Sequence, residues 1–107
     1  MDLETLHEYA TSLGQIEDCQ PFGPETIVYK TKGKMFLLIA IDQNPLSINV
    51  KCNPELAVEL REKHTSIVPG FHMNKKHWNT ITIDNTLSQK QLKDFIKHSF
   101  ELVSKTK

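Results

Sequence analysis

The sequence has no excess of charge of either sign, because 13 lysine and arginine residues balance 13 aspartate and glutamate residues over 107 positions. Without a net charge, the chain has no overall field that would attract a polyanion. Any binding to nucleic acid therefore has to come from a local cluster of basic side chains, and it should be weak and sensitive to salt.

Long apolar segments are also missing. The longest apolar run, residues 35–41, is far shorter than the roughly 20 residues that a membrane-spanning helix needs. The N-terminus is acidic and lacks the apolar stretch of a secretory signal peptide. We therefore expect a cytoplasmic protein that has no membrane partner.

Cysteine is scarce. The only two, Cys19 and Cys52, lie far apart and outside any Cys-x-x-Cys pattern, which fits a reducing compartment better than a disulfide scaffold. Cys52 alternates with apolar residues and should be buried. The chain also lacks a Gly-rich phosphate loop, a nucleophile elbow and a carboxylate pair. The sequence therefore predicts no catalytic residue and no cofactor.

What is present suits one globular domain over residues 1–107, with 38% hydrophobic and 24% charged residues. Helical spacing of apolar residues predicts helices over residues 3–13, from 54 to about 64, and from 88 to the basic end of the chain. β-branched and alternating patterns predict strands over residues 26–31, 34–41, 46–52, 67–68 and 77–83. The predicted fold is α+β, in the order α-β-β-β-α-β-β-α, with an antiparallel sheet (a meander plus a hairpin) packed with three helices.

The last helix has the clearest local signals. Ser88 and Gln91 have the spacing of a capping box, and Leu87 and Leu92 that of a hydrophobic staple. Asn53, followed by proline and glutamate, predicts the start of the middle helix equally well.

The segment between the second and third predicted helices has an unusual composition. No acidic residue occurs between His64 and Ile83, although the chain as a whole is neutral. Three of the five histidines, His64, His72 and His77, and the only tryptophan, Trp78, fall in this part of the chain. It predicts a surface segment with cationic and aromatic side chains.

Four short motifs frame this segment and the elements before it: PFG at 21–23, NPEL at 53–56, PGFHM at 69–73 and KHWN at 76–79. With these motifs in this order, nearly the whole chain resembles the MmcQ/YjbR family. The resemblance implies a small bacterial cytoplasmic protein, whose fold is compared with CyaY/frataxin-like domains and with the double wing of a phage transcription factor. Family members are usually described as DNA-binding, so the resemblance implies DNA as the partner.

DNA contacts are expected from the segment 71–79. Lysine and histidine would meet phosphates, asparagine would meet phosphates or base edges, and tryptophan would stack on an unpaired base or enter a groove. If Ile81 and Ile83 are in the core, alternation turns Trp78 at least partly outward. The expected site residues are His72, Asn74, Lys75, Lys76, His77, Trp78 and Asn79, with a second basic wing at Lys30, Lys32 and Lys34.

The strongest alternative hypothesis is a protein- or small-ligand-binding module. Phe71, Met73 and Trp78 lie near a Pro-Gly break and would line an adaptable apolar pocket. A simpler alternative is that Phe71 and Met73 fill the core under the hairpin.

Two further hypotheses have less support from the sequence. A metal site would have to use His64, His72 and His77, and no cysteine pair or glutamate joins them at a zinc-motif spacing. An enzyme would need a base beside its nucleophile, and neither Cys19 nor Cys52 has one nearby in the chain. We therefore predict no metal site and a protein that is not an enzyme.

Overall fold

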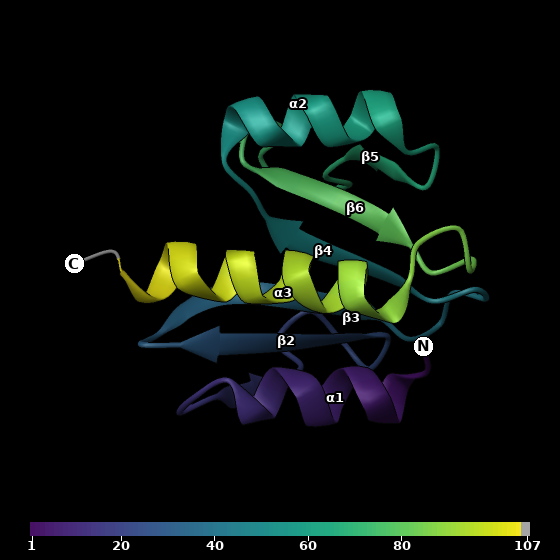
Figure 1. Cartoon of the computed structure of the whole chain (residues 1–107). Coiled ribbons are helices and arrows are strands. Elements are labelled where there is room, and N and C mark those ends of the chain that lie inside the picture. The colour runs from purple at the N-terminus through teal and green to yellow at the C-terminus, as the bar shows by residue number, and fades with distance from the viewer. Residues whose placement is uncertain (106–107) are drawn as a thin grey trace.

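The computed structural model describes residues 1–105, which form a six-stranded antiparallel sheet and three helices (Figure 1). The strands lie in the order β1-β2-β3-β4-β6-β5. The predicted α+β architecture is confirmed. In chain order the elements are α1 (Leu3–Ser12), β1 (Glu17–Cys19), β2 (Thr26–Thr31), β3 (Lys34–Ala40), β4 (Ser47–Lys51), α2 (Pro54–Lys63), β5 (Ile67–Pro69), β6 (Trp78–Thr82) and α3 (Gln89–Ser104).

One strand was not predicted. β1 lies between the first predicted helix and the first predicted strand, and it pairs with β2 through Glu17↔Lys30 and Cys19↔Val28. It has only three residues, two of them acidic and exposed, so neither length nor hydrophobic alternation marks it. The predicted order α-β-β-β-α-β-β-α therefore lacks one strand at the edge of the sheet.

The main core lies on one face of the sheet. Figure 1 shows α3 crossing in front of β3 and β4, with α1 and α2 on either side of it. Side chains on this face alternate with those of the opposite face, as the pleat of a strand requires. The buried residues of this core include Tyr29, Leu37, Ile39, Ile48, Val50 and Ile81 from the sheet and Leu6, Ala10, Leu92, Ile96 and Val103 from α1 and α3.

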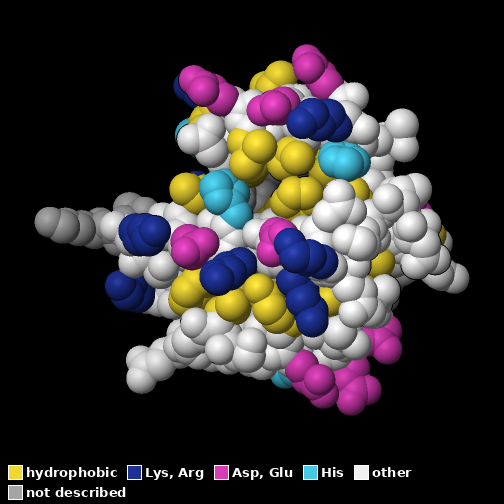
Figure 2. All heavy atoms as spheres, in the orientation of Figure 1, with side chains coloured by type: hydrophobic (Ala, Val, Ile, Leu, Met, Phe, Trp, Pro, Cys, Tyr) yellow, Lys and Arg dark blue, Asp and Glu magenta, His cyan; other side chains and the backbone are white. Residues whose placement is uncertain are grey.

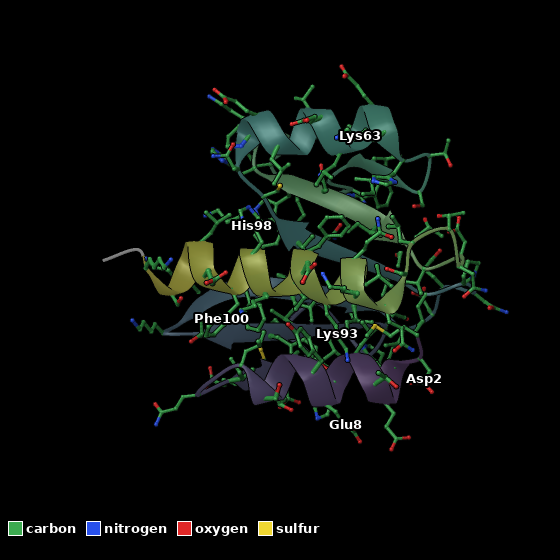
Figure 3. All side chains as sticks on the ribbon, in the orientation of Figure 1. Asp2, Glu8, Lys63, Lys93, His98 and Phe100 are labelled. Carbon is green, nitrogen blue, oxygen red and sulfur yellow. The ribbon has the colours of Figure 1, made fainter. Side chains whose placement is uncertain are left out.

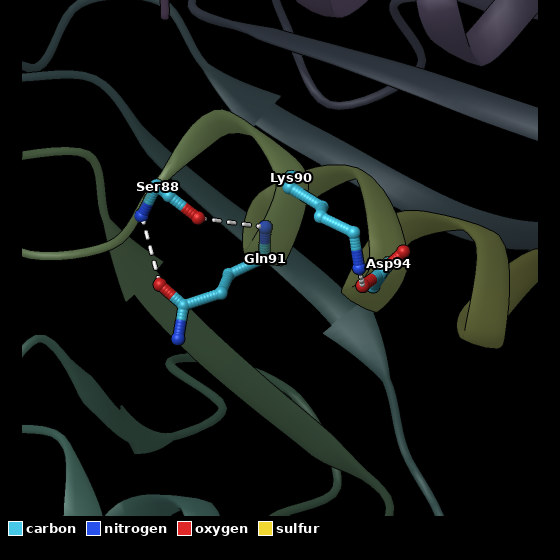
Figure 4. Close-up of polar contacts among 4 residues, drawn as sticks. All are labelled: Ser88, Lys90, Gln91 and Asp94. Carbon is cyan, nitrogen blue, oxygen red and sulfur yellow. Dashed lines mark hydrogen bonds and ion pairs between the residues drawn. The ribbon is translucent and has the colours of Figure 1, made fainter.

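The start of α3 confirms its predicted signals (Figure 4). The Ser88 hydroxyl accepts a hydrogen bond from the Gln91 backbone N–H at 3.1 Å, and the Gln91 side chain accepts one from the Ser88 N–H at 2.9 Å. Leu87 and Leu92 are both buried in the core, as the staple predicts. These contacts fix where the helix begins and how it enters the core.

Ser99 of α3 joins two strands where their pairing ends. Its hydroxyl donates to the Phe36 carbonyl at 2.6 Å and accepts from the Lys51 N–H at 2.8 Å. The regular register of β3 and β4 stops nearby, at Leu37↔Val50. A buried helix side chain thus satisfies two backbone groups that the sheet leaves unpaired at this point.

α1 is attached to the sheet and to α3 by polar contacts at the edge of the core. The His7 Nδ1 atom lies 2.8 Å from the Tyr29 hydroxyl. Burial, with a smaller contribution from the charge of Asp18, raises the pKa of Tyr29 to about 12. Lys93 of α3 points toward α1, with its Nζ atom 5.4 Å from the centre of the Tyr9 ring (Figure 3).

α2 covers β6 and β5 on the same face. The Asn79 side chain, on the same side of β6 as Ile81, donates to the Ala57 carbonyl of α2 at 3.5 Å. Figure 2 shows apolar side chains gathered between α2 and α3. Leu60, Phe95 and His98 line a small gap there. The free space there is only about 10 Å³. The helix-covered face is therefore closed to a ligand between these helices.

The three helices all lie on this face (Figure 1), so within residues 1–105 the opposite, open face of the sheet has no helix on it. The sheet ends at both edges in three-residue strands, β1 and β5. β5 ends in Pro69, which has no backbone N–H to donate. Within residues 1–105, none of the helices is long and apolar enough to cross a membrane.

Candidate binding groove on the open face of the sheet

The open face carries small and polar side chains in two rows that cross the strands. The rows follow from the register, because directly paired residues point to the same side of a sheet. The first row is Thr26, Ala40, Ser47 and Thr82, and the second is Leu38, Asn49, Thr80 and Val68. Together they form a floor that is mostly hydroxyl, amide and methyl groups.

Loops from three parts of the chain enclose this floor. They come before β2, between β3 and β4, and after β5, and they leave a groove of about 820 Å³. Phe22 and Phe71 are exposed by 62% and 66%, and both line the groove. Large aromatic side chains that face water beside a hollow are candidates for ligand contact.

The wall formed by residues 70–77 is fastened to the floor through Thr80. The Phe71 N–H donates to the Thr80 hydroxyl at 2.8 Å, and that hydroxyl donates in turn to the Asn49 side-chain carbonyl. The Gly70 N–H donates to the Trp78 carbonyl at 2.8 Å. This part of the groove wall is therefore held in place without a ligand.

Arg61 of α2 holds the same loop from the helix side. Its Nε atom donates to the Asn79 side-chain oxygen at 2.6 Å, and its terminal nitrogen donates to the carbonyls of Trp78, at 3.2 Å, and Lys75. Lys75 continues the network by donating from Nζ to the Gly70 carbonyl at 3.0 Å. The sequence did not single out Arg61, because a basic residue near a helix C-terminus is common for electrostatic reasons alone.

The PGFHM motif has a geometric explanation. A Cβ atom on Gly70 would lie 2.7 Å from the Trp78 Cβ and 3.0 Å from its carbonyl oxygen, so only glycine fits this close approach. His72 has a φ of 61°, in the left-handed region, and the centroid of its ring lies 4.0 Å from that of the Phe71 ring. A non-glycine residue in this region has a backbone strain of about 1–3 kcal/mol, which surrounding contacts must offset.

The structure separates the residues predicted to bind DNA. The Trp78 side chain is only 8% exposed and packs with Val28 and Leu38, with Met73 against them. Alternation correctly puts it opposite Asn79, but the expectation that it points outward is wrong, because residues 70–77 fold back over it. Asn79 is 1% exposed and faces α2. Neither side chain is accessible to DNA in this conformation.

The other predicted contacts lie nearer the surface. His72, Asn74 and Lys76 are exposed and His77 is half-buried, whereas the exposed Lys75 is tied by Nζ to the Gly70 carbonyl. The Asn74 side chain accepts from the Lys76 N–H at 2.9 Å, which shapes the loop tip. The seven residues therefore do not form one contiguous surface.

The lysines of the predicted second wing lie around the β2–β3 turn. Lys30 is directly opposite Glu17 in the sheet, and Lys32 donates from Nζ to the Ser104 carbonyl at 2.9 Å. The turn is at the same end of the sheet as the start of β6, which pairs with the end of β4 through Lys51↔Trp78. Lys34 begins β3 beside this turn.

The predicted apolar pocket is present in part. Phe71 and Met73 line the groove, so Phe71 does not fill the core, whereas Trp78 is not among the lining residues and supports the floor from one side. Phe22 was missed, although the PFG motif places an apolar side chain between turn residues. Across residues 1–105, no three His, Cys, Asp or Glu side chains come together as a metal site.

A family model described as YjbR matches residues 11–102. This chain belongs to the YjbR family. It is 39% identical over 107 residues to the uncharacterized protein YbdF of Escherichia coli O157:H7, covering 96% of this chain and 88% of that protein. It is 31% identical over 72 residues to the uncharacterized protein YjbR of Escherichia coli K12, covering 67% and 61%. The family predicted from the sequence motifs is confirmed.

Two solved structures of related proteins have the same fold. The crystal structure of Deinococcus radiodurans protein DR2400, a DUF419 domain, superimposes with a TM-score of 0.93 at 38% identity, over 97% of this chain and 79% of that one. A crystal structure of a Pseudomonas syringae protein gives a TM-score of 0.81 at 28% identity, over 95% and 98%. The sheet and helices that form the groove thus belong to an architecture shared with these proteins.

Proposed function

We propose that this YjbR-family chain is a non-catalytic binding protein whose ligand site is the groove on the open face of the sheet. The observation that carries the proposal is the hollow of about 820 Å³ that the exposed rings of Phe22 and Phe71 line. Small-molecule sites in proteins commonly have volumes of roughly 300–1,000 Å³, apolar walls and a few fixed polar groups. The groove has each of these features.

The arrangement of the wall supports the same proposal. Thr80 and Arg61 hold residues 70–77 from opposite sides of the sheet, so the groove exists before a ligand arrives. A preformed site avoids the free-energy cost of ordering its loops on binding. The second row of the floor also presents the Asn49 amide beside the Thr80 hydroxyl, where polar groups of a ligand would be oriented.

A fragment screen by ¹H–¹⁵N NMR on the full chain tests the groove. We expect small aromatic fragments to shift the amide signals of Asn49, Phe71 and Thr80. The substitutions F22A and F71A should each weaken this binding by about 1 kcal/mol, the typical contribution of an aromatic contact. Val58, exposed on α2, provides the control V58A. Shifts confined to the helix-covered face, or equal affinity in F71A and V58A, would contradict the proposal.

DNA binding is the second candidate function, favoured by the exposed Lys76 and His72 on a loop without acidic residues. That loop is near the end of the sheet that also carries the lysines of the β2–β3 turn. The double variant K75A/K76A should weaken binding about equally across DNA sequences and reduce the salt slope by roughly 2. K90A/K97A, on the outer surface of α3, is the matched control.

Fluorescence anisotropy over a salt series measures both effects. Because the Trp78 indole is buried, DNA that binds this conformation should leave the tryptophan emission unchanged. No binding by the unmodified chain at low salt would remove this candidate.

Cys19 and Cys52 are both free thiols, which fits the reducing cytoplasm that we propose as the compartment.

A further inference from the structure

We propose that the ligand of the groove is a small organic cation, with an apolar or aromatic body between Phe22 and Phe71 and an ammonium group near Glu25 and Asp42. This inference rests on the proposed function of the groove as a binding site. It follows from the charge, the walls and the size of the groove.

The charge of the groove is negative although the chain is neutral. Among the described residues that line it, two are carboxylates, Glu25 and Asp42, and none is lysine or arginine, so the formal charge with neutral histidine is 0 − 2 = −2. The two acids lie on adjacent segments of backbone, since the N–H of Ile41, the residue before Asp42, donates to the Glu25 carbonyl at 2.9 Å. A hollow with one sign of charge concentrates ligands of the opposite sign.

Both carboxylates are available to a ligand. Lys63–Glu59 and Lys90–Asp94 are ion pairs of the part of the chain that the structure describes, and neither Glu25 nor Asp42 is paired in this way there. Glu25 and Asp42 are exposed at the rim. A ligand ammonium could therefore approach them without displacing a cation of the protein.

The walls and floor suit the same ligand. The faces of aromatic rings attract cations, and Phe22 and Phe71 are the exposed rings of the groove. Thr26, Ser47 and Thr82 also line the groove. Their hydroxyl groups are neutral and can accept hydrogen bonds from an ammonium group. An anionic ligand would meet two carboxylates, and none of the described residues that line the groove is lysine or arginine.

The size of the floor favours a small molecule. The first row runs across β2, β3, β4 and β6, and the second across β3, β4, β6 and β5. Each row covers three interstrand spacings of about 4.8 Å, or roughly 14 Å. A compact molecule with one aromatic ring and a short alkyl amine spans a large part of this length. The diameter of a DNA duplex is larger than the length of this floor, so a duplex would contact only the rim.

Three matched probes test the charge preference: 3-phenylpropylamine, 3-phenyl-1-propanol and 3-phenylpropionate. They share one aromatic body and are cationic, neutral and anionic at pH 7. Titrated into the ¹⁵N-labelled full chain at low salt, the amine should bind about three- to fivefold more tightly than the alcohol, as expected for exposed ion pairs, and the carboxylate should bind most weakly. The amine should shift the amides of Glu25, Asp42, Phe71 and Thr80. At about 0.5 M salt the preference should largely disappear.

The isosteric double variant E25Q/D42N should bind the amine and the alcohol equally. The control E8Q/E62Q removes the same charge from exposed positions of α1 and α2 and should keep the preference for the amine. The amide spectrum of each variant establishes that it is folded.

The outcomes separate the two proposals. If the alcohol or the carboxylate binds as tightly as the amine, or if E25Q/D42N keeps the preference, the cation assignment is overturned and the groove remains a ligand site. If none of the three probes shifts the groove amides of the folded chain, both the cation assignment and the proposed binding function fail.

Discussion

The two faces of the sheet are built from the same strands but carry different kinds of side chain. On the helix-covered face, isoleucines lie in or against the core; for four of them, one sequence neighbour on the open face is small or carries a hydroxyl group. The neighbouring pairs are Ile27 and Thr26, Ile39 and Ala40, Ile48 and Ser47, and Ile81 and Thr82. A single period-2 pattern thus encodes a core on one side and the floor of a groove on the other.

The difference shows which face carries the core of the fold and which face is left for the binding that we propose. Burial of branched apolar side chains under α1 and α3 supplies the main driving force for folding. The open face contributes only a small apolar cluster, Val28, Leu38 and Trp78, at one end of the groove. Its remaining side chains therefore contribute little to the apolar core.

Replacing adjacent residues of β6 should give the largest contrast between the faces. Ile81 is buried in the core, so I81A should lower the free energy of unfolding by about 2–5 kcal/mol. Thr82 is half-buried on the groove floor, and T82A should change it by less than about 1 kcal/mol. Urea denaturation of both variants measures the difference. Similar losses for the two would mean that the open face also carries the stability of the fold.

Removing Arg61 should have an intermediate effect, because this side chain links the two faces. R61M would leave the buried Asn79 oxygen without its donor, which should cost about 1–3 kcal/mol of unfolding free energy. Hydrogen exchange of the Gly70 and Phe71 amides should also become faster, since the loop loses its attachment to α2.

The control for this variant is K63M on the same helix, since Lys63 makes only an exposed ion pair with Glu59 at 3.5 Å. Its effect should stay within about 0.5 kcal/mol. If R61M and K63M behave alike in stability and exchange, Arg61 does not position the wall of the groove.

The smallest expected effect is on the reactivity of thiols and not on stability. It compares one cysteine from each face of the sheet. Cys52 is buried near α3, and burial raises the pKa of its thiol, whereas Cys19 is only half-buried beside the open-face cluster. With Ellman's reagent at pH 8, Cys19 of the native chain should react quickly and Cys52 about tenfold more slowly or slower still. The thiolate is the reactive form, and the raised pKa of Cys52 leaves less of it. C19S should abolish the fast phase. A fast phase that persists in C19S would mean that Cys52 is accessible.

The sequence predicted those parts of the fold that local patterns determine. The predicted strand at 26–31 is reproduced residue for residue, and α2 and α3 begin where Asn53 and Ser88 cap them. Capping residues and alternation act over a few positions, so a single sequence contains them in full. β1 was missed because its three residues are held by backbone pairing with β2, which leaves no side-chain pattern.

The candidate site was harder to predict because it is assembled from distant segments. Phe22, Asp42 and Phe71 come from three loops, and only the pairing of the strands brings them to one hollow. Alternation gave the correct side of β6 for Trp78, but not the loop that folds over it. The hydrogen bonds from Arg61 that hold this loop depend on tertiary contacts between α2 and β6, which a local pattern does not contain.

The short edges of the sheet have a consequence for how the protein behaves among its neighbours. An exposed strand can template the addition of another molecule, and long, flat edges are the usual starting point of fibrils. Here each border offers three residues, and at β5 a proline removes one donor from that border. Other chains therefore find few unpaired backbone groups at which they could add a strand to this sheet. This limits aggregation although the groove exposes two phenylalanine side chains to solvent.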